Sequence, residues 1–383
     1  MLGIKRTFTR LALGIEENFD ALALALRKRL SGDAPLQIVT YRSYGTVNRL
    51  YIKGRVLKEK AIPKSSRVDS IWKNLVSMYK RFESDEVPQA RLRVNFQNKF
   101  YEVTSDDEGY FRVNHLTETS LTREDMWYEA DVELIDAPTS FSPGLKNTAH
   151  ILIPPIDSEY GIISDIDDTI VKTTATDLLA MAKNTFFHNA HTRLPFAGVS
   201  EFYKSLQLGR NGKRNNPFFY VSSSPWNLYD LLVDFLDLND IPEGPLLLRD
   251  LGLDSNKESA DHMGHKFKEI KNILLAYPHL NFVLIGDSGQ EDPKIYREVV
   301  KKFPGRILAI YIRDVQLADR EKIAIEISKG LVDDKVEMII VDNTIEAAEH
   351  AARIGLIYAD AVPQIVADKK QDKGEISGKE LLA

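Results

Sequence analysis

The stretch YGIISDIDDTIVKTT (residues 160–174) places three carboxylates directly after an apolar run. Residues 161–164 have the pattern of a strand that is buried on both faces, as the strands of parallel sheets are. Asp165, Asp167 and Asp168 then follow within four positions. Burial and mutual repulsion oppose such crowding, so a bound cation is expected at this end of the strand. Because the candidate ligands are all oxygens, the hard cation Mg²⁺ fits better than zinc.

The same kind of apolar strand recurs along the second half of the chain, and each copy ends at a polar residue. These further strand ends are Ser222, Asp250, Asp287, Asp314 and Asp342. Helical patterns lie between the strands, and this alternation predicts a doubly wound parallel sheet. Ligands of such sheets bind at the carboxyl ends of the strands. The polar residues are therefore expected to meet at one edge of the sheet.

The chain of 383 residues is too long for one ordinary core, so two domains are expected. Residues 34–153 contain short alternating runs separated by turn formers, which predicts a β-rich, sandwich-like domain. Residues 154–362 are expected to form the α/β domain. Residues 363–383 lack periodicity and are predicted to be disordered. Residues 1–33 predict an amphipathic helix, which would either pack on its own domain or lie on a membrane surface.

The composition excludes several classes of function. The formal net charge of −6 gives no overall attraction to nucleic acid, so no nucleic-acid partner is expected. The sequence has no cysteine, which excludes disulfides, thiolate zinc sites and cysteine nucleophiles. No apolar run approaches the roughly 20 residues of a membrane span. We expect a cytoplasmic protein that can attach peripherally to a membrane.

Three further motifs place reactive side chains near the predicted sheet edge. The run YVSSSPWN supplies Ser222 and Ser223 just before a helix, where free N–H groups favour an anion. The run GHKFKEI begins a helix and places Lys266 off its apolar stripe. The run IGDSGQEDP places Asp287 and Asp292 after a strand, with glycines that permit a tight turn.

Asp165, Asp167 and Thr169 form a D-x-D-x-T motif. In this order, the motif and the three runs above resemble the haloacid dehalogenase (HAD) superfamily of aspartyl phosphatases. The stretches SDIDDTI, FFYVSSSPWNLYDLLVDFL, HKFKEI and FVLIGDSGQEDP resemble more narrowly the actin-patch-type phosphatidate phosphatases and their bacterial relatives, which share D-x-D-x-T with the lipins. This resemblance covers residues 150–315. It implies a HAD-like sheet and the Mg²⁺-dependent hydrolysis of phosphatidate to diacylglycerol and phosphate at a phospholipid membrane surface.

The resemblance also implies roles for the acidic residues. Asp165 would attack phosphorus and form an aspartyl phosphate. Asp167 would protonate the leaving alcohol and then activate water, a role that suits a carboxyl group with acidic neighbours. The candidate Mg²⁺ ligands are Asp165, Asp167, Asp287 and Asp292. For Asp292 two other roles stay open, namely orienting the lysine and capping a helix.

The remaining site residues would bind the phosphate group. Lys266 would balance the charge of the phosphoryl oxygens, and Ser222 and Ser223 would donate hydrogen bonds to them. Ser224 could share that role. Thr169 would complete this set or support its loop.

Three further choices also stay open. Asp168 could be a loop-capping or outer-shell residue, or it could be a metal ligand. Lys268 is the alternative to Lys266, although the start of the helix favours Lys266. Trp226 follows the serines and could either meet an acyl chain or pack at the start of a helix.

The intervals between the motifs are too short for a large lid, so the site is expected to be nearly capless. An open site suits a large or membrane-embedded phosphomonoester better than a small metabolite. One alternative keeps the chemistry and changes the substrate to another phospholipid, a phosphoprotein or a soluble phosphomonoester. Another alternative is a membrane- or protein-binding module with a vestigial HAD domain. Acyl preference, oligomeric state and the role of the N-terminal domain do not follow from the sequence.

Overall fold

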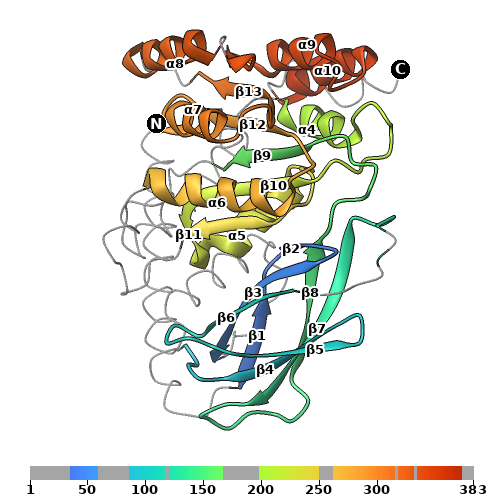
Figure 1. Ribbon diagram of the computed structural model, residues 1–383, viewed down its shortest axis with the longest axis vertical. Coiled ribbons are helices and arrows are strands. Elements are labelled where there is room, and N and C mark those ends of the chain that lie inside the picture. The colour runs from blue at the N-terminus through green and yellow to red at the C-terminus, as the bar shows by residue number, and fades with distance from the viewer. Residues whose placement is uncertain are drawn as a thin grey trace, which may run out of the picture.

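The computed structural model describes residues 35–58, 86–116, 121, 123–166, 198–249, 262–314, 318–331 and 334–372. The predicted helix over residues 1–33 lies outside these ranges, and so do Asp167, Asp168 and Thr169. The described residues form two sheets, and Figure 1 shows the mixed sheet of the N-terminal half below the parallel sheet of the C-terminal half. In this part of the chain, no helix is long and apolar enough to cross a membrane.

The first sheet contains eight strands within the described residues. They are β1 (Leu36–Thr40), β2 (Ser43–Thr46), β3 (Arg49–Lys58), β4 (Arg91–Phe96), β5 (Lys99–Thr104), β6 (Tyr110–Leu116), β7 (Trp127–Asp136) and β8 (Lys146–Leu152). Strands β2 and β8 are parallel and the other neighbours are antiparallel, so the sheet is mixed. Buried and exposed residues alternate along β4 and through the middle of β7, as expected for strands with one face on a core.

The mixed sheet curls around a single apolar core. Strand β3 pairs with β1 and β2 on one side and with β6 on the other. Strand β5 lies at one end of the sheet, and its Tyr101 ring stacks 5.7 Å from the ring of His115 on β6. The β-rich prediction is therefore confirmed. The hydrogen bonds connect the strands as one curled sheet and do not divide them into two separate sheets.

The second sheet has six parallel strands in the order β11-β10-β9-β12-β13-β14. They are β9 (Gly161–Asp165), β10 (Phe218–Pro225), β11 (Leu246–Arg249), β12 (Phe282–Asp287), β13 (Ile307–Arg313) and β14 (Glu337–Val341). The chain runs from the centre of the sheet outward through β9, β10 and β11. It then returns to the centre and runs outward in the other direction through β12, β13 and β14. This order has a switch point between β9 and β12, as dinucleotide-binding sheets do. The predicted parallel α/β domain is confirmed.

Helices cover both faces of the parallel sheet. One face carries α4 (Val199–Leu208), α5 (Tyr229–Leu238), α9 (Thr344–Arg353) and α10 (Val362–Asp372). The other face carries α6 (His262–Ala276), α7 (Asp292–Lys302) and α8 (Ala318–Leu331). Because both faces are covered, strands such as β10 and β12 are buried at every residue.

One sequence-based prediction needs correction. Residues 363–383 were expected to be disordered, but helix α10 continues to Asp372. Ile365 is fully buried in the apolar core of that face, and Val362 packs against the same core. Two apolar residues spaced three apart stabilise the helix by packing, but they are too few to produce a clear periodic pattern in the sequence.

Candidate active site

The candidate site lies at the switch point of the parallel sheet. Asp165 is the last residue of β9 and Asp287 is the last residue of β12. These two strands are direct neighbours, with Ser164 opposite Ile285. Asp165 is 5% exposed and Asp287 is 9% exposed, so both carboxylates end their strands inside the protein. The fold therefore brings together two of the predicted acidic residues where parallel sheets bind ligands.

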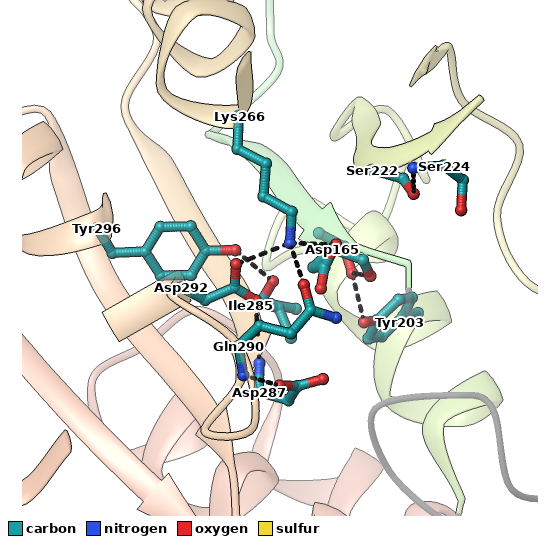
Figure 2. Close-up of polar contacts among 11 residues, drawn as sticks. Asp165, Tyr203, Ser222, Ser224, Lys266, Ile285, Asp287, Gln290, Asp292 and Tyr296 are labelled. Atoms are coloured by element: carbon teal, nitrogen blue, oxygen red, sulfur yellow. Dashed lines mark hydrogen bonds and ion pairs between the residues drawn. The ribbon is translucent and has the colours of Figure 1, made fainter. Parts of the chain in front are cut away.

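Lys266 extends from the first turns of α6 into this acidic cluster (Figure 2). Its Nζ lies 2.9 Å from Oδ1 of Asp165 and 2.9 Å from Oδ1 of Asp292. The same ammonium group donates a 2.8 Å hydrogen bond to Oε1 of Gln290. Lys268, the alternative lysine, is exposed on the same helix. The geometry therefore assigns the buried contacts to Lys266.

Asp292 connects the lysine to the backbone of the β12 turn. Its Oδ2 accepts a 3.2 Å hydrogen bond from the N–H of Asp287, while its Oδ1 faces Lys266. The residue is completely buried, and Glu291 occupies the N-cap of α7. The carboxylate of Asp292 therefore contacts both Lys266 and the turn, which fits the orienting role that the sequence leaves open for it.

Gly286 makes this turn possible. A Cβ atom at Gly286 would lie 2.4 Å from Oδ2 of Asp292, well inside van der Waals contact. Gln290 also belongs to the turn, because its N–H donates a 3.0 Å hydrogen bond to Oδ1 of Asp287. Sequence reasoning missed Gln290. The only signal was its place in the run IGDSGQEDP, between the two predicted acids.

The predicted phosphate-binding serines end strand β10. Val221 pairs with Asp165, so Ser222 follows at the level of the candidate nucleophile. Oγ of Ser222 accepts a 3.0 Å hydrogen bond from the N–H of Ser224 (Figure 2). The hydroxyls of Ser223 and Ser224 are buried and have no hydrogen-bond partner within the described residues. Buried polar groups normally have partners, so Ser222–Ser224, named the serine turn below, are suited to a polar ligand.

Buried tyrosines support the strands that carry the two acids. Oγ of Ser164 lies 2.7 Å from the hydroxyl of Tyr203 on α4 and donates a 3.0 Å hydrogen bond to the carbonyl of Asp165. The hydroxyl of Tyr296 on α7 donates a 2.8 Å hydrogen bond to the carbonyl of Ile285. Burial raises the pKa of both tyrosines, so both stay protonated donors. No sequence motif pointed to either tyrosine.

His265 precedes Lys266 and faces the serine turn. Burial, and next the charge of Arg249, lower the pKa of His265 to about 4, while the carbonyls of Leu247 and Ser222 oppose that shift. The imidazole is therefore neutral at physiological pH. It contributes no positive charge to the site, and its hydrogen-bonding contact with Ser222 is to the backbone.

The donor chemistry of the site fits a hard cation. Asp165 and Asp287 supply carboxylate oxygens from adjacent strand ends, which is the ligand type that Mg²⁺ prefers. No group of three or more histidine or acidic side chains that could hold a metal ion occurs among the described residues. Asp167, another of the expected ligands, lies outside them.

The strand order and the buried polar cluster define a doubly wound α/β domain with an acidic, lysine-containing site at its switch point. Residues 160–314 of this domain match the family model for the catalytic domain of phosphatidate phosphatase APP1. The resemblance to actin-patch-type phosphatidate phosphatases is thereby confirmed for this segment.

The chain is 38% identical over 199 residues to phosphatidate phosphatase APP1 of Saccharomyces cerevisiae, a match that covers 47% of this chain and 32% of that protein. It is 26% identical over 226 residues to an uncharacterized protein of Schizosaccharomyces pombe, covering 58% of this chain and 36% of that protein. The chain thus spans about a third of the length of these curated relatives. A carbohydrate acetylesterase from Xanthomonas citri aligns with 88% of this chain and 76% of its own chain at 9% identity, with a TM-score of 0.29.

Proposed function

We propose that this protein is a Mg²⁺-dependent, HAD-type phosphatase with a nearly capless site that hydrolyses phosphatidate to diacylglycerol and phosphate. The observation that carries this proposal is the buried contact of Lys266 with Asp165 at the switch point, inside the segment that matches the phosphatidate phosphatase catalytic domain. An anionic substrate group would enter between the carboxylate and the serine turn. Lys266 supplies a cation there, and the hydroxyls of Ser223 and Ser224 have no hydrogen-bond partner among the residues that the structure describes.

The first chemical step is a transfer of the phosphoryl group to the protein. A carboxylate oxygen of Asp165 would attack phosphorus, and the bond between phosphorus and the ester oxygen would break. The leaving alkoxide would take a proton from Asp167. Water would then attack phosphorus and give one proton to Asp167, and the bond between phosphorus and the Asp165 oxygen would break. This step releases inorganic phosphate and the free carboxylate of Asp165.

The surrounding residues would hold the reacting groups in place. Asp165, Asp167 and Asp287 would hold Mg²⁺, which when bound offsets negative charge on the phosphoryl oxygens. Lys266 would contribute positive charge to the same oxygens. Asp292 would keep that lysine directed at Asp165, as its 2.9 Å contact with Nζ suggests.

The phosphate group would be held by the serine turn. Ser222 and Ser223 would donate hydrogen bonds to its oxygens, with Ser224 as a further donor. Thr169 would complete this set or support the loop of the first motif. The buried hydroxyls of Ser223 and Ser224 support this assignment.

Phosphatidate is favoured as substrate because the relative that is 38% identical is a phosphatidate phosphatase by name. The reaction would take place at a phospholipid surface, with the protein cytoplasmic and peripherally attached. The curled mixed sheet would form a domain of its own beside the HAD-like core. Another phospholipid, a phosphoprotein or a soluble phosphomonoester would use the same chemistry.

A substrate comparison tests this proposal. Phosphate release is measured from phosphatidate in mixed micelles, from two other phospholipid monoesters and from soluble phosphomonoesters, each with Mg²⁺ and with EDTA. The proposal predicts fastest release from phosphatidate and loss of release in EDTA. Faster release from soluble compounds would reject the lipid substrate but keep the chemistry. No release from any compound would favour a binding module with a vestigial domain.

A further inference from the structure

The serine turn continues directly into a segment that packs against the mixed sheet. After Pro225, residues 226–228 form the short 3-10 helix η1 (Trp226–Leu228), and α5 begins at Tyr229. The ring of Trp226 lies 4.5 Å from the ring of Tyr41, which follows strand β1. Trp226 is 6% exposed. This tryptophan therefore packs between the two halves of the protein, which decides between the two roles that the sequence leaves open for it.

Lys53 of strand β3 holds the tryptophan from the side of the mixed sheet. Its Nζ lies 4.1 Å from the centre of the Trp226 ring and 4.3 Å from the centre of the Tyr110 ring. An ammonium group between two aromatic faces is attracted to both. This contact fixes the first residue of η1 relative to β3 and β6.

Arg55, two residues further along β3, holds the next residue of η1. Its Nη1 donates a 3.2 Å hydrogen bond to Oδ1 of Asn227. Its Nε donates a 2.7 Å hydrogen bond to the carbonyl of Glu108, and its Nη2 forms a 3.0 Å ion pair with Glu86. The guanidinium group also lies 4.4 Å from the centre of the Tyr110 ring. Because all three nitrogens of the planar group have partners, Arg55 is a rigid anchor for Asn227.

A second contact between the two halves lies at the other end of α6 from Lys266. The hydroxyl of Tyr277, the residue after α6, donates a 2.9 Å hydrogen bond to the carbonyl of Gly45 on β2. Lys266 lies near the opposite end of the same helix, about 16 Å away at the usual helical rise. This contact joins the same two halves without adjoining the serine turn, so it provides a matched control.

We propose that Lys53 and Arg55 of the mixed sheet are positioning residues for the phosphate-binding turn. Through Trp226 and Asn227 they hold the start of η1, and this fixes Ser222–Ser224 at the level of Asp165. The proposal rests on the proposed phosphatase function, and it gives the N-terminal sheet a role in the active site. A small displacement of donors that hold a reacting group weakens their contacts, so the anchor controls phosphate affinity.

Asn227 offers the sharpest test, because it is half-buried and its loss should not unfold the protein. The variant Asn227→Leu keeps the side-chain volume and removes the acceptor for Arg55. Asn227→Asp keeps an acceptor and should behave like the wild type. Lys53→Met removes the cation and keeps the apolar stem. Tyr277→Phe removes the distant hydrogen bond between the same two halves. Phosphatidate hydrolysis and competitive inhibition by inorganic phosphate are measured for each variant well below its melting temperature.

The proposal predicts that Asn227→Leu weakens inhibition by phosphate and raises KM about tenfold, with kcat changed about threefold or less, because the serines contact the phosphate in substrate and transition state alike. Lys53→Met should also weaken inhibition by phosphate and raise KM. Asn227→Asp and Tyr277→Phe should stay within about twofold of the wild type. An unchanged KM and phosphate inhibition in Asn227→Leu would overturn the proposal, as would the same shift in Tyr277→Phe.

Calorimetric titration with inorganic phosphate separates this proposal from the proposed function. A wild-type protein that binds phosphate but hydrolyses nothing would reject the phosphatase assignment. The affinities of the wild type and Asn227→Leu would then decide the positioning role alone. A wild-type protein that neither hydrolyses phosphatidate nor binds phosphate would overturn both.

Discussion

The ammonium group of Lys266 lies 2.9 Å from Oδ1 of Asp165, and both side chains are only 4% exposed. A buried ion pair of this kind is a weak source of stability, because each charge loses its hydration. Asp292 adds a second carboxylate to the same lysine at 2.9 Å. Three charges are thus held at the switch point of the sheet. The proposed phosphoryl transfer would use them, whereas they contribute little to the stability of the fold.

Replacing Lys266 with methionine should damage both activity and stability. Two buried carboxylates would lose their common cation, which should lower the free energy of unfolding by about 3–5 kcal/mol. Phosphate release should fall about 10²–10³-fold. Urea denaturation and steady-state assays measure the two effects. Lys268→Met, on the exposed side of the same helix, should stay within about 0.5 kcal/mol of the wild type. Equal activity of the two variants would contradict the role of Lys266.

Adding a methyl group at Gly286 should displace Asp292. The new Cβ would lie 2.4 Å from Oδ2 of Asp292, so the carboxylate must move away from Lys266. We expect Gly286→Ala to lower stability by about 1–3 kcal/mol and to lower kcat/KM by at least about tenfold. Thermal unfolding and kinetics provide the measurements.

The matched control for Gly286 is Gly330, an exposed glycine in α8 with nothing within 4 Å of its added Cβ. Gly330→Ala should raise stability by about 0.5–1 kcal/mol, because alanine favours helix, and should leave kcat/KM unchanged. If Gly286→Ala were as active as Gly330→Ala, the close contact with Asp292 would have no role in the site.

His265 should make the protein less stable in acid. Its pKa in the folded protein is about 4, below the usual value of about 6.5. Between these pH values the unfolded chain binds a proton that the folded protein does not, so stability falls as pH drops through this range. The loss attributable to His265 should be about 2–3 kcal/mol.

The variant His265→Gln isolates this effect, because glutamine does not titrate. Its free energy of unfolding should approach that of the wild type, or exceed it, as the pH falls from 7.5 to 4.5. Parallel stability curves over that range would show that the imidazole is not buried in its neutral form.

The sequence predicted the parts of the site that depend on strand ends. Asp165 and Asp287 directly follow apolar runs, and the fold brings any two neighbouring strand ends together. Lys266 was found because it lies near the start of a helix and off its apolar stripe. Each of these features is defined by the local periodicity of a strand or a helix, so it can be predicted from the sequence alone.

The contacts that complete the site could not be predicted in this way. The hydrogen bond between Ser164 and Tyr203 joins residues 39 positions apart, and it depends on how α4 packs on the sheet. The contact of Arg55 with Asn227 joins residues 172 positions apart, across the two halves of the protein. Such pairs are set by tertiary packing, which leaves no local pattern at either residue.

The most direct test of the central claim is phosphate release from phosphatidate in mixed micelles by the wild type and by Asp165→Asn, each with Mg²⁺ and with EDTA. Asparagine has nearly the shape of aspartate, and a fold check by circular dichroism should show no change. We predict Mg²⁺-dependent release by the wild type and none above background by the variant. Release by Asp165→Asn at a rate near that of the wild type would contradict the account, because another group would then attack phosphorus.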